Sequence, residues 1–190
     1  MLTVILTGGS SRRMGRDKAL LPYGDGTLLQ TLIDRYAAFG PVGVSVDKAG
    51  RFPFRGALEL PDAFPGQGPM NGIVSGFRAA EAQELLLTAV DLPCGDPALA
   101  QRLSELRGGA DACVLHFGPK GIEPLFAVYG RVCLPAAEDC LRAGRKALLA
   151  LLERVNVRYV SPGELPGFDL ARILTNVNTP EDFRSVIGEK

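Results

Sequence analysis

Two glycines and four cations follow the first apolar segment of the chain. Gly8 and Gly9 come soon after the apolar run Leu2–Leu6, and the cations lie just beyond them: Arg12, Arg13, Arg16 and Lys18. Backbone N–H groups of glycine approach an anion closely because no Cβ stands in the way. The cations can compensate negative charge, so this composition predicts a loop that binds phosphate groups.

The spacing of this loop matches neither of two common phosphate-binding motifs. The pattern GxGxxG is absent, and GxxxxGK[ST] fails because Gly15 is too far from Lys18 and Ala19 follows the lysine. An ordinary mobile surface turn and a degenerate form of either motif remain alternative interpretations.

A carboxylate stands at the end of another apolar segment. Asp91 follows the run "LLLTAV" and precedes Leu92 and Pro93. Proteins usually hold Mg²⁺ through one or two carboxylates together with phosphate oxygens of the substrate. Capping of the next helix is the alternative role, but Asp96, just before Pro97, already fits it. Asp91 is therefore predicted to bind Mg²⁺.

Predicted strands and helices alternate along the chain. Short apolar runs predict strands at Leu2–Leu6, Val42–Val46, Leu85–Val90, Ala112–His116 and Val157–Val160. Helical periodicity predicts helices at Thr27–Phe39, Met70–Ala82, Pro97–Arg107, Arg131–Ala143, Lys146–Arg154 and Pro180–Ile187. The segment "EPLFAVY", Glu123–Tyr129, predicts one further strand that could run antiparallel.

This alternation indicates an α/β fold. Nearly continuous apolar strands suit a sheet covered on both faces, and strand–helix alternation favours parallel pairing with right-handed crossovers. We expect a single domain over residues 1–190 with a doubly wound, mostly parallel sheet and helices on both faces. The Pro/Gly-rich stretch "LPDAFPGQGPMNG" is expected to be a loop. Ligands bind beyond the carboxyl ends of such strands, where Gly8 and Asp91 both lie.

Composition argues against several other classes. Lys plus Arg and Asp plus Glu both total 21, so the chain lacks the net charge of a nucleic-acid or membrane-surface binder. No apolar stretch is long enough to span a bilayer and no cationic leader precedes the first strand, so a cytoplasmic protein is expected. The four cysteines form no CxxC pair and His116 is the only histidine, which argues against a zinc site.

The first loop carries a more specific signal. "LTGGSSRRMGRDKALLPYG" resembles the signature Leu-Ala-Gly-Gly-x-Ser-x-Arg-Met-Gly-x-Asp-Lys of nucleotidyltransferases of the sugar-nucleotide type. Further segments resemble motifs of the same group in the same order: "LPDAFPGQGPMNGI", "TAVDLP", "EPLFAVY" and "NVNTPEDF". Within the group, the chain is most similar to the molybdenum cofactor guanylyltransferases. Thr7 and Asn71 stand where that family has alanine.

The resemblance implies a fold and a reaction. The fold is the Rossmann variant of nucleotide-diphospho-sugar transferases. In the reaction, a terminal phosphate of molybdopterin attacks the α-phosphorus of GTP, which gives the guanine dinucleotide cofactor and pyrophosphate with Mg²⁺ as cofactor. The attacking phosphate is already ionised, so catalysis should come from positioning and charge stabilisation.

The resemblance also assigns residues to the triphosphate. It places one stretch of backbone against the nucleotide: Leu6, Thr7, Gly8 and Gly9. Arg13 and Lys18 would stabilise charge on the triphosphate and on the leaving pyrophosphate. Asp91 would hold Mg²⁺, and these three side chains form the implied catalytic set.

Other residues are assigned to the base and to the acceptor. The resemblance places two carboxylates and two glycines against the nucleotide: Asp47, Asp62, Gly68 and Gly72. It assigns the pterin or its phosphate to Lys146, Asn176 and Asn178. Asp47 could equally be an ordinary turn aspartate, Lys146 a solvated lysine, and Thr179-Pro180 a helix cap.

Three alternative functions remain. A cytidylyl-transferring relative more often carries Ala-Ala-Gly in its first loop and an Asp-x-Asp ending, whereas Thr7-Gly8-Gly9 and Asn176-Val177-Asn178 favour guanine. A sugar-phosphate or isoprenoid-precursor nucleotidyltransferase is a second alternative. A GTP-binding regulator or cofactor carrier on the same scaffold is the third. Transient contact with molybdoenzyme-maturation proteins is expected, without nucleic acid or membrane as partners.

Overall fold

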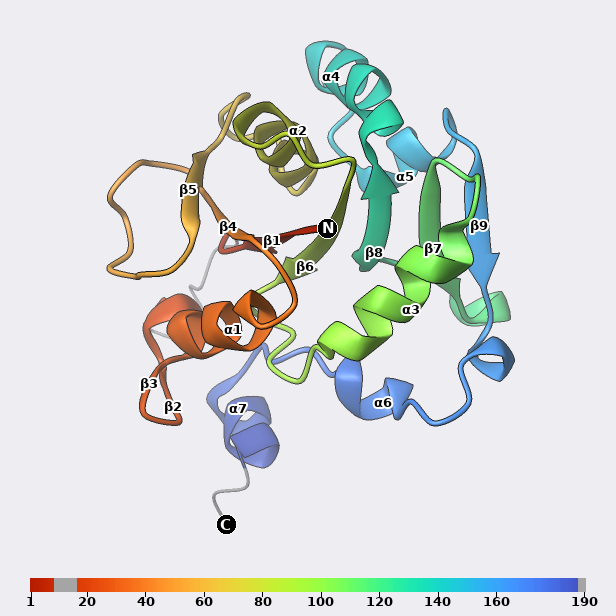
Figure 1. Cartoon of the computed structure of the whole chain (residues 1–190). Helices are drawn as coiled ribbons and strands as arrows, with labels where there is room; N and C mark the ends of the chain where they lie inside the picture. The colour runs from red at the N-terminus through yellow and green to blue at the C-terminus, as the bar shows by residue number, and fades with distance from the viewer. Residues whose placement is uncertain (9–16, 188–190) are drawn as a thin grey trace.

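The computed structural model describes residues 1–8 and 17–187 (Figure 1). Its described strands are β1 Leu2–Leu6, β2 Pro22–Tyr23, β3 Gly26–Thr27, β4 Val42–Val46, β5 Leu58–Pro61, β6 Glu84–Ala89, β7 Ala112–His116, β8 Ile122–Gly130 and β9 Val157–Val160. The described α-helices are α1 Leu28–Ala37, α2 Met70–Ala79, α3 Pro97–Arg107, α4 Leu134–Arg142, α5 Leu148–Leu152, α6 Leu170–Ile173 and α7 Pro180–Ile187. Among the described residues, no helix has both the length and the apolar composition needed to span a membrane.

The main sheet is mixed but mostly parallel. Its seven strands follow the order β5-β4-β1-β6-β8-β7-β9. The strands pair in parallel except for β8, which is antiparallel to both of its neighbours, β6 and β7. The chain fills one side of β1 with β4 and β5 and then returns to the other side as β6. The strand order therefore reverses between β1 and β6, the place where doubly wound sheets bind ligands.

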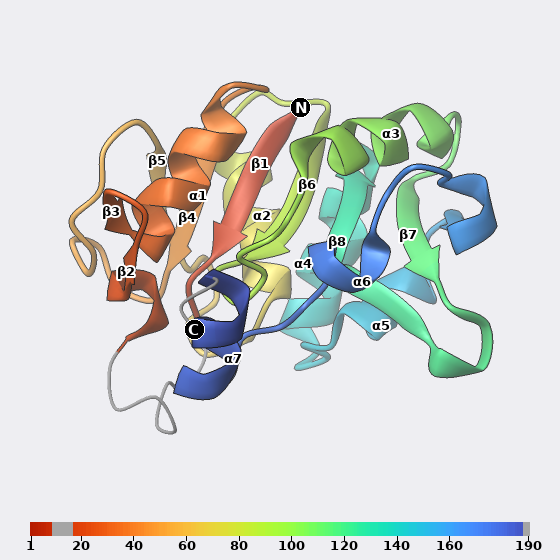
Figure 2. The same cartoon turned by 90° about the horizontal axis from the view of Figure 1, so that it is seen from below.

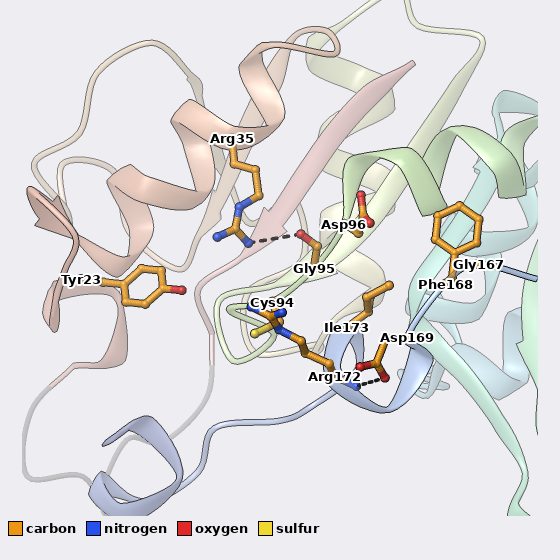
Figure 3. Close-up of a pocket in the computed structure, with 10 residues that line it drawn as sticks. All are labelled: Tyr23, Arg35, Cys94, Gly95, Asp96, Gly167, Phe168, Asp169, Arg172 and Ile173. Carbon is orange, nitrogen blue, oxygen red and sulfur yellow. Dashed lines mark hydrogen bonds between the residues drawn. The ribbon is translucent and has the colours of Figure 1, made fainter. Parts of the chain in front are cut away.

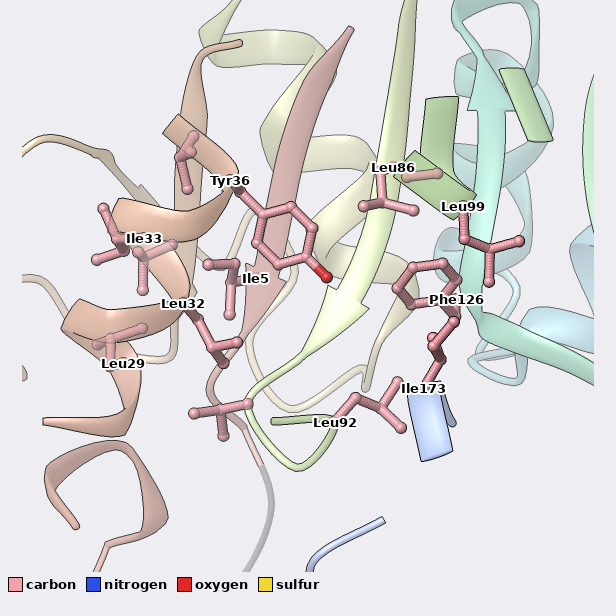
Figure 4. Close-up of a cluster of buried hydrophobic side chains, with 14 of the residues drawn as sticks. Ile5, Leu29, Leu32, Ile33, Tyr36, Leu86, Leu92, Leu99, Phe126 and Ile173 are labelled. Carbon is pink, nitrogen blue, oxygen red and sulfur yellow. The ribbon is translucent and has the colours of Figure 1, made fainter. Parts of the chain in front are cut away.

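Helices cover both faces of this sheet (Figure 1). Side chains of β1 alternate between the two faces: Ile5 packs in the cluster that includes residues of α1 and α3, and Val4 packs in the cluster with α2, α4 and α5. Figure 4 shows the first cluster, with the Tyr36 ring between Ile5 and Leu86 in this view. Fully burying an aliphatic or aromatic side chain contributes roughly 1.5–3 kcal/mol, so the two layers hold the strand ends in place.

Most predicted elements are confirmed. Several have the predicted bounds: β1, β4, β7, β9, α3 and α7. The Glu123–Tyr129 segment lies within antiparallel β8. β6 starts and ends one residue earlier than Leu85–Val90, and α1, α2 and α5 are shorter than predicted.

Two segments differ from the sequence pattern for local reasons. The predicted helix Arg131–Ala143 begins as a 3₁₀ turn at Arg131–Cys133 and becomes α-helical only at Leu134, where a proline occupies the first turn of α4. The predicted loop "LPDAFPGQGPMNG" is shorter than expected, because its first residues end β5 and its last ones begin α2. β5 is an edge strand that exposes most of its side chains, so it lacks an apolar run.

Candidate active site

A cavity of about 620 Å³ lies at the carboxyl ends of β1, β4 and β6. Its lining contains six of the predicted nucleotide-site residues: Leu6, Gly8, Asp47, Asp62, Gly68 and Asp91. The remaining lining residues are Ser45, Arg51, Gly66, Pro69, Ala89 and Leu125. The volume falls in the range of sites that hold small-molecule ligands.

Backbone pairing fixes the strand ends around this cavity. Leu6 is in register with Ala89, and the Val90 N–H donates to the Leu6 carbonyl at 2.9 Å. Buried Thr7 donates its hydroxyl to the Ser45 carbonyl at 2.6 Å, which ties the end of β1 to β4. A hydroxyl at this position therefore adds an anchor that alanine could not. A Cβ on Gly8 would meet no described atom within 4 Å, so its backbone is open to a ligand.

Asp91 is a partly buried carboxylate with an unpaired oxygen. Its Oδ1 is inaccessible to solvent and has no hydrogen-bond partner among the described residues. Burial raises the pKa of Asp91, and the positive charge of Lys18 opposes this rise. A buried carboxylate oxygen without a donor is costly, and a divalent cation would satisfy it. The surroundings of Asp91 thus fit its predicted role as a ligand of Mg²⁺.

The C-terminal Asn-Val-Asn segment contacts the backbone of Asp91 and the side chain of Lys18. The Val177 N–H donates to the Asp91 carbonyl at 2.8 Å, and the Val177 side chain is fully buried. The Lys18 ammonium donates to Asn178 Oδ1 at 3.0 Å. Figure 2 shows α7, which follows this segment, at the end of the sheet toward which β1 points. The structure therefore brings Lys18, Asp91 and Asn178 together, and exposed Asn176 lies two residues before Asn178.

A capping box holds Asn178 in place. Thr179 Oγ1 accepts from the Asp182 N–H, and Asp182 Oδ2 accepts from the N–H groups of Asn178 and Thr179, both at 2.9 Å. These backbone hydrogen bonds lower the pKa of Asp182. Thr179-Pro180 thus caps α7, while the Asn178 side chain is free to bind Lys18.

Helix α2 holds the loop that carries Asp62. Asn71 is fully buried: its Oδ1 accepts from the Phe64 N–H at 2.8 Å, and its Nδ2 donates to the Phe64 carbonyl at 2.6 Å. Ser75 donates to the Pro61 carbonyl and accepts from the Ala63 N–H. Asn71, where the resembling family has alanine, therefore organises one wall of the cavity.

The two predicted glycines of this region differ in role. Gly68 lines the cavity and has φ of +74°, a left-handed conformation that favours glycine. Gly72 does not line it. A Cβ on Gly72 would lie 2.5 Å from Leu6 Cδ2 and 3.1 Å from Leu87 Cδ1, so glycine here permits close packing of α2 on the sheet. The exposed Lys146 has its backbone beside Gly68, since a Cβ there would lie 3.7 Å from the Lys146 carbonyl oxygen.

Two carboxylates on the β4 side have different surroundings. Asp47 is ion-paired with Arg51 at 2.7 Å, and this contact lowers its pKa. Burial raises the pKa of Asp62 and the charge of Asp47 raises it further, while a hydrogen bond with the Ser45 side chain opposes this rise. Asp62 is therefore the carboxylate that gains more from a donor on a ligand.

Sequence reasoning missed several residues of the site. Arg51 and Ser45 belong to no recognised motif. Glu123, included only in a predicted strand, does not line the cavity, but burial and the charge of Asp91 raise its pKa, and its Oε1 accepts from the Leu125 N–H at 2.9 Å. Its place at the start of "EPLFAVY", an acid opening an apolar strand, was an available signal. Gly9 and Arg13 lie outside the described residues.

A second cavity of about 380 Å³ lies between α1, α3 and α6 (Figure 3). Arg35 of α1 donates there to the carbonyls of Pro93 and Gly95, at 2.5 and 3.2 Å. These contacts hold the turn that follows Asp91. Of the predicted site residues that the structure describes, none lines this cavity.

Comparison with known proteins gives one consistent family. Residues 3–157 match the MobA-like NTP transferase domain. A probable molybdenum cofactor guanylyltransferase of Carboxydothermus hydrogenoformans is 32% identical over 98% of this chain and 95% of its own length. One from Pelotomaculum thermopropionicum is 36% identical over 95% of this chain and 88% of its own.

A solved structure agrees with these relatives. The crystal structure of molybdopterin-guanine dinucleotide biosynthesis protein A from Archaeoglobus fulgidus superimposes with a TM-score of 0.83 at 25% identity, covering 99% of this chain and 97% of the other. The family match over residues 3–157 includes β1, β4 and β6, whose carboxyl ends line the cavity. The chain therefore belongs to the MobA-like NTP transferase family.

Proposed function

We propose that this protein is a molybdenum cofactor guanylyltransferase, which transfers GMP from GTP to the terminal phosphate of molybdopterin and releases pyrophosphate. The observation that carries this proposal is the convergence of Gly8, Lys18 and Asp91 beside a cavity at the point where the strand order reverses. The similarity to guanylyltransferases over nearly the whole chain supports the choice of substrates.

The first step is binding of the triphosphate at the end of β1. The open backbone at Gly8 would donate to phosphate oxygens, and the Lys18 ammonium would exchange Asn178 for phosphate or contact both. Gly9 and Arg13 are proposed to extend this cradle. Asp62 would accept from the guanine edge, with Gly68 and Asp47 beside it.

Asp91 would hold Mg²⁺ through its unpaired carboxylate oxygen. When bound, Mg²⁺ would neutralise charge on the phosphate oxygens of the nucleotide. Asn176, Asn178 and Lys146 are proposed to bind the acceptor, because Asn178 and Lys146 approach the cavity region from elements outside the nucleotide loops.

The transfer itself needs no side-chain base. An oxygen of the ionised acceptor phosphate forms a bond to the α-phosphorus while the bond from that phosphorus to the bridging oxygen breaks, and pyrophosphate departs with the electron pair. His116, which packs on Tyr159 with ring centroids 5.8 Å apart, does not line the cavity. The chain's contribution is alignment and charge stabilisation by Lys18.

Nucleotide selectivity tests this proposal. GTP with Mg²⁺ should raise the melting temperature more than CTP, ATP or UTP does, because a ligand that binds the native state more tightly stabilises it more. Purified molybdopterin with each nucleotide should then release pyrophosphate fastest from GTP. An equal or larger shift and rate with CTP would reassign the protein to cytidylyl transfer, and binding of GTP without any transfer would indicate a regulator or carrier.

A further inference from the structure

One guanidinium joins the loops that follow β1 and β4. Arg51 Nη2 lies 2.8 Å from Asp17 Oδ2, and Arg51 Nη1 lies 2.7 Å from Asp47 Oδ1. The Arg51 side chain also lines the cavity. We name these three residues, Asp17, Arg51 and Asp47, the Arg51 bridge. It connects Asp17, which follows β1 along the chain, with the loop that follows β4.

The Asp17 end of the bridge leads directly to Lys18. Asp17 Oδ1 accepts from the Ala19 N–H at 3.3 Å and caps the 3₁₀ turn Lys18–Leu20. The two carboxylate oxygens of Asp17 thus have separate tasks, one on the turn and one on Arg51. The backbone of Lys18 is fixed by this turn, while its ammonium reaches Asn178 at 3.0 Å. Movement of Asp17 would therefore move Lys18.

The Asp47 end has a consequence for recognition of the base. Asp47 Oδ1 is engaged by Arg51, so reading guanine through this oxygen would require breaking the ion pair. Asp62 lies in the same cavity and forms no ion pair with a basic side chain in the described part of the chain. The arrangement favours Asp62 as the residue that recognises guanine, and Asp47 as the residue that holds Arg51.

The geometry of arginine suits this task. A planar guanidinium presents separate N–H groups to two carboxylates at once, whereas a lysine ammonium is a single point charge. Partly exposed ion pairs add little to global stability. The effect of the bridge is therefore expected in turnover and in the placement of Lys18, with little change in the melting temperature.

We propose that Arg51 is a positioning residue: it holds Asp17 and thereby the turn that presents Lys18 to the triphosphate, and Asp47 acts through Arg51 rather than on the base. The reaction assayed rests on the proposed function, but the placement of Lys18 does not.

Single variants test the first part. Arg51→Ala should lower kcat for GMP transfer about tenfold, leave KM for GTP within about twofold and leave the melting temperature unchanged. Arg51→Lys should recover only part of the rate. Arg55→Ala is the matched control, because this exposed arginine lies on the same loop and none of its described contacts is an ion pair. A raised Kd for GTP with unchanged kcat would mean that Arg51 binds nucleotide itself, and would overturn the proposal.

A double variant tests the connection to Asp17. Asp17→Asn combined with Arg51→Ala should be no slower than the slower single variant, because both changes break the same link. Rates that fall by the product of the two single effects would overturn the proposal. Asp47→Asn should slow GTP and CTP by the same factor, and a changed ratio of their kcat/KM values would show that Asp47 reads the base.

A readout independent of turnover separates this inference from the proposed function. Reductive methylation of Lys18, followed by mass spectrometry and normalised to exposed Lys146, should be at least threefold faster in Arg51→Ala and unchanged in Arg55→Ala. Wild-type protein that transfers nothing from GTP would reject the proposed function alone. Equal Lys18 reactivity in wild type and Arg51→Ala would reject the Arg51 bridge alone.

Discussion

Replacing Asp91 by asparagine tests whether the buried carboxylate of this residue binds Mg²⁺. The change keeps the shape of the side chain and removes the charge of a carboxylate whose buried Oδ1 has no partner in the described part of the chain. A buried unsatisfied polar atom costs about 1–3 kcal/mol, and a charged one more. The metal-free variant should therefore be as stable as wild type at pH 7, or more stable by up to about 2 kcal/mol.

The raised pKa of Asp91 predicts how the stability difference between Asp91→Asn and wild type depends on pH. A carboxyl whose pKa is higher in the native state binds more protons when folded, so wild-type stability falls as the pH rises from the unfolded-state value, about 4, through the folded-state pKa. Asparagine removes this contribution. The stability advantage of Asp91→Asn should thus grow across that window and vanish below it.

The rate should change in the opposite direction. If Asp91 holds Mg²⁺, loss of its charge should slow transfer at least a hundredfold, about 3 kcal/mol in the barrier, and abolish the extra thermal stabilisation that Mg²⁺ adds to the GTP complex. Calorimetric melting and magnesium-titrated rates on one preparation measure both. Asp96→Asn is the matched control, since asparagine still caps α3 there.

Two results would contradict these expectations for Asp91. An Asp91→Asn protein with normal rate and normal response to Mg²⁺ would remove the metal from this residue. A metal-free variant less stable than wild type by more than about 1 kcal/mol would mean that the carboxylate supports the fold, as an ordinary hydrogen-bonded aspartate does.

The remaining predictions concern Lys18 and Gly72. Lys18→Ala should lower kcat at least a hundredfold without changing the melting temperature, because the partly exposed ammonium contacts the Asn178 amide and acts on charge in the transition state; unchanged turnover would exclude the lysine from the mechanism. Gly72→Ala should cost about 1–3 kcal/mol in urea unfolding, because a Cβ would lie 2.5 Å from Leu6 Cδ2; Gly109→Ala, whose Cβ meets nothing within 4 Å, is the control, and equal stability of the two variants would contradict the packing argument.

The sequence pattern predicted the strands and helices that are marked by hydrophobic periodicity or by residues typical of a helix start. The buried strands were recognised because both of their faces are apolar, as in Leu2–Leu6, and α3 because Asp96 and Pro97 mark its start. The edge strand β5 escaped notice because only Leu60 of its four residues is buried. Edge strands carry no continuous apolar signal.

The site was predictable where a motif marks a strand end, and not where two loops meet. Gly8 and Asp91 follow apolar strands, so their place was readable from the sequence. The contact of Arg51 with Asp17 joins residues from two irregular loops, and no spacing rule links them. Gly72 was predicted to face the ligand because it lies in a matching motif, and only the packing of α2 on Leu6 accounts for its lack of a side chain.

The hydrogen bond from the Val177 amide to the Asp91 carbonyl makes that amide a natural probe. Because Val177 is fully buried, its amide proton exchanges with solvent only when the C-terminal segment separates from the end of β6. Deuterium uptake at Val177 therefore measures how often the C-terminal segment separates from Asp91, in the middle of the chain, under native conditions. Slower uptake with GTP alone would mean that the donor nucleotide closes this junction, whereas slower uptake only after molybdopterin is added would assign closure to the acceptor.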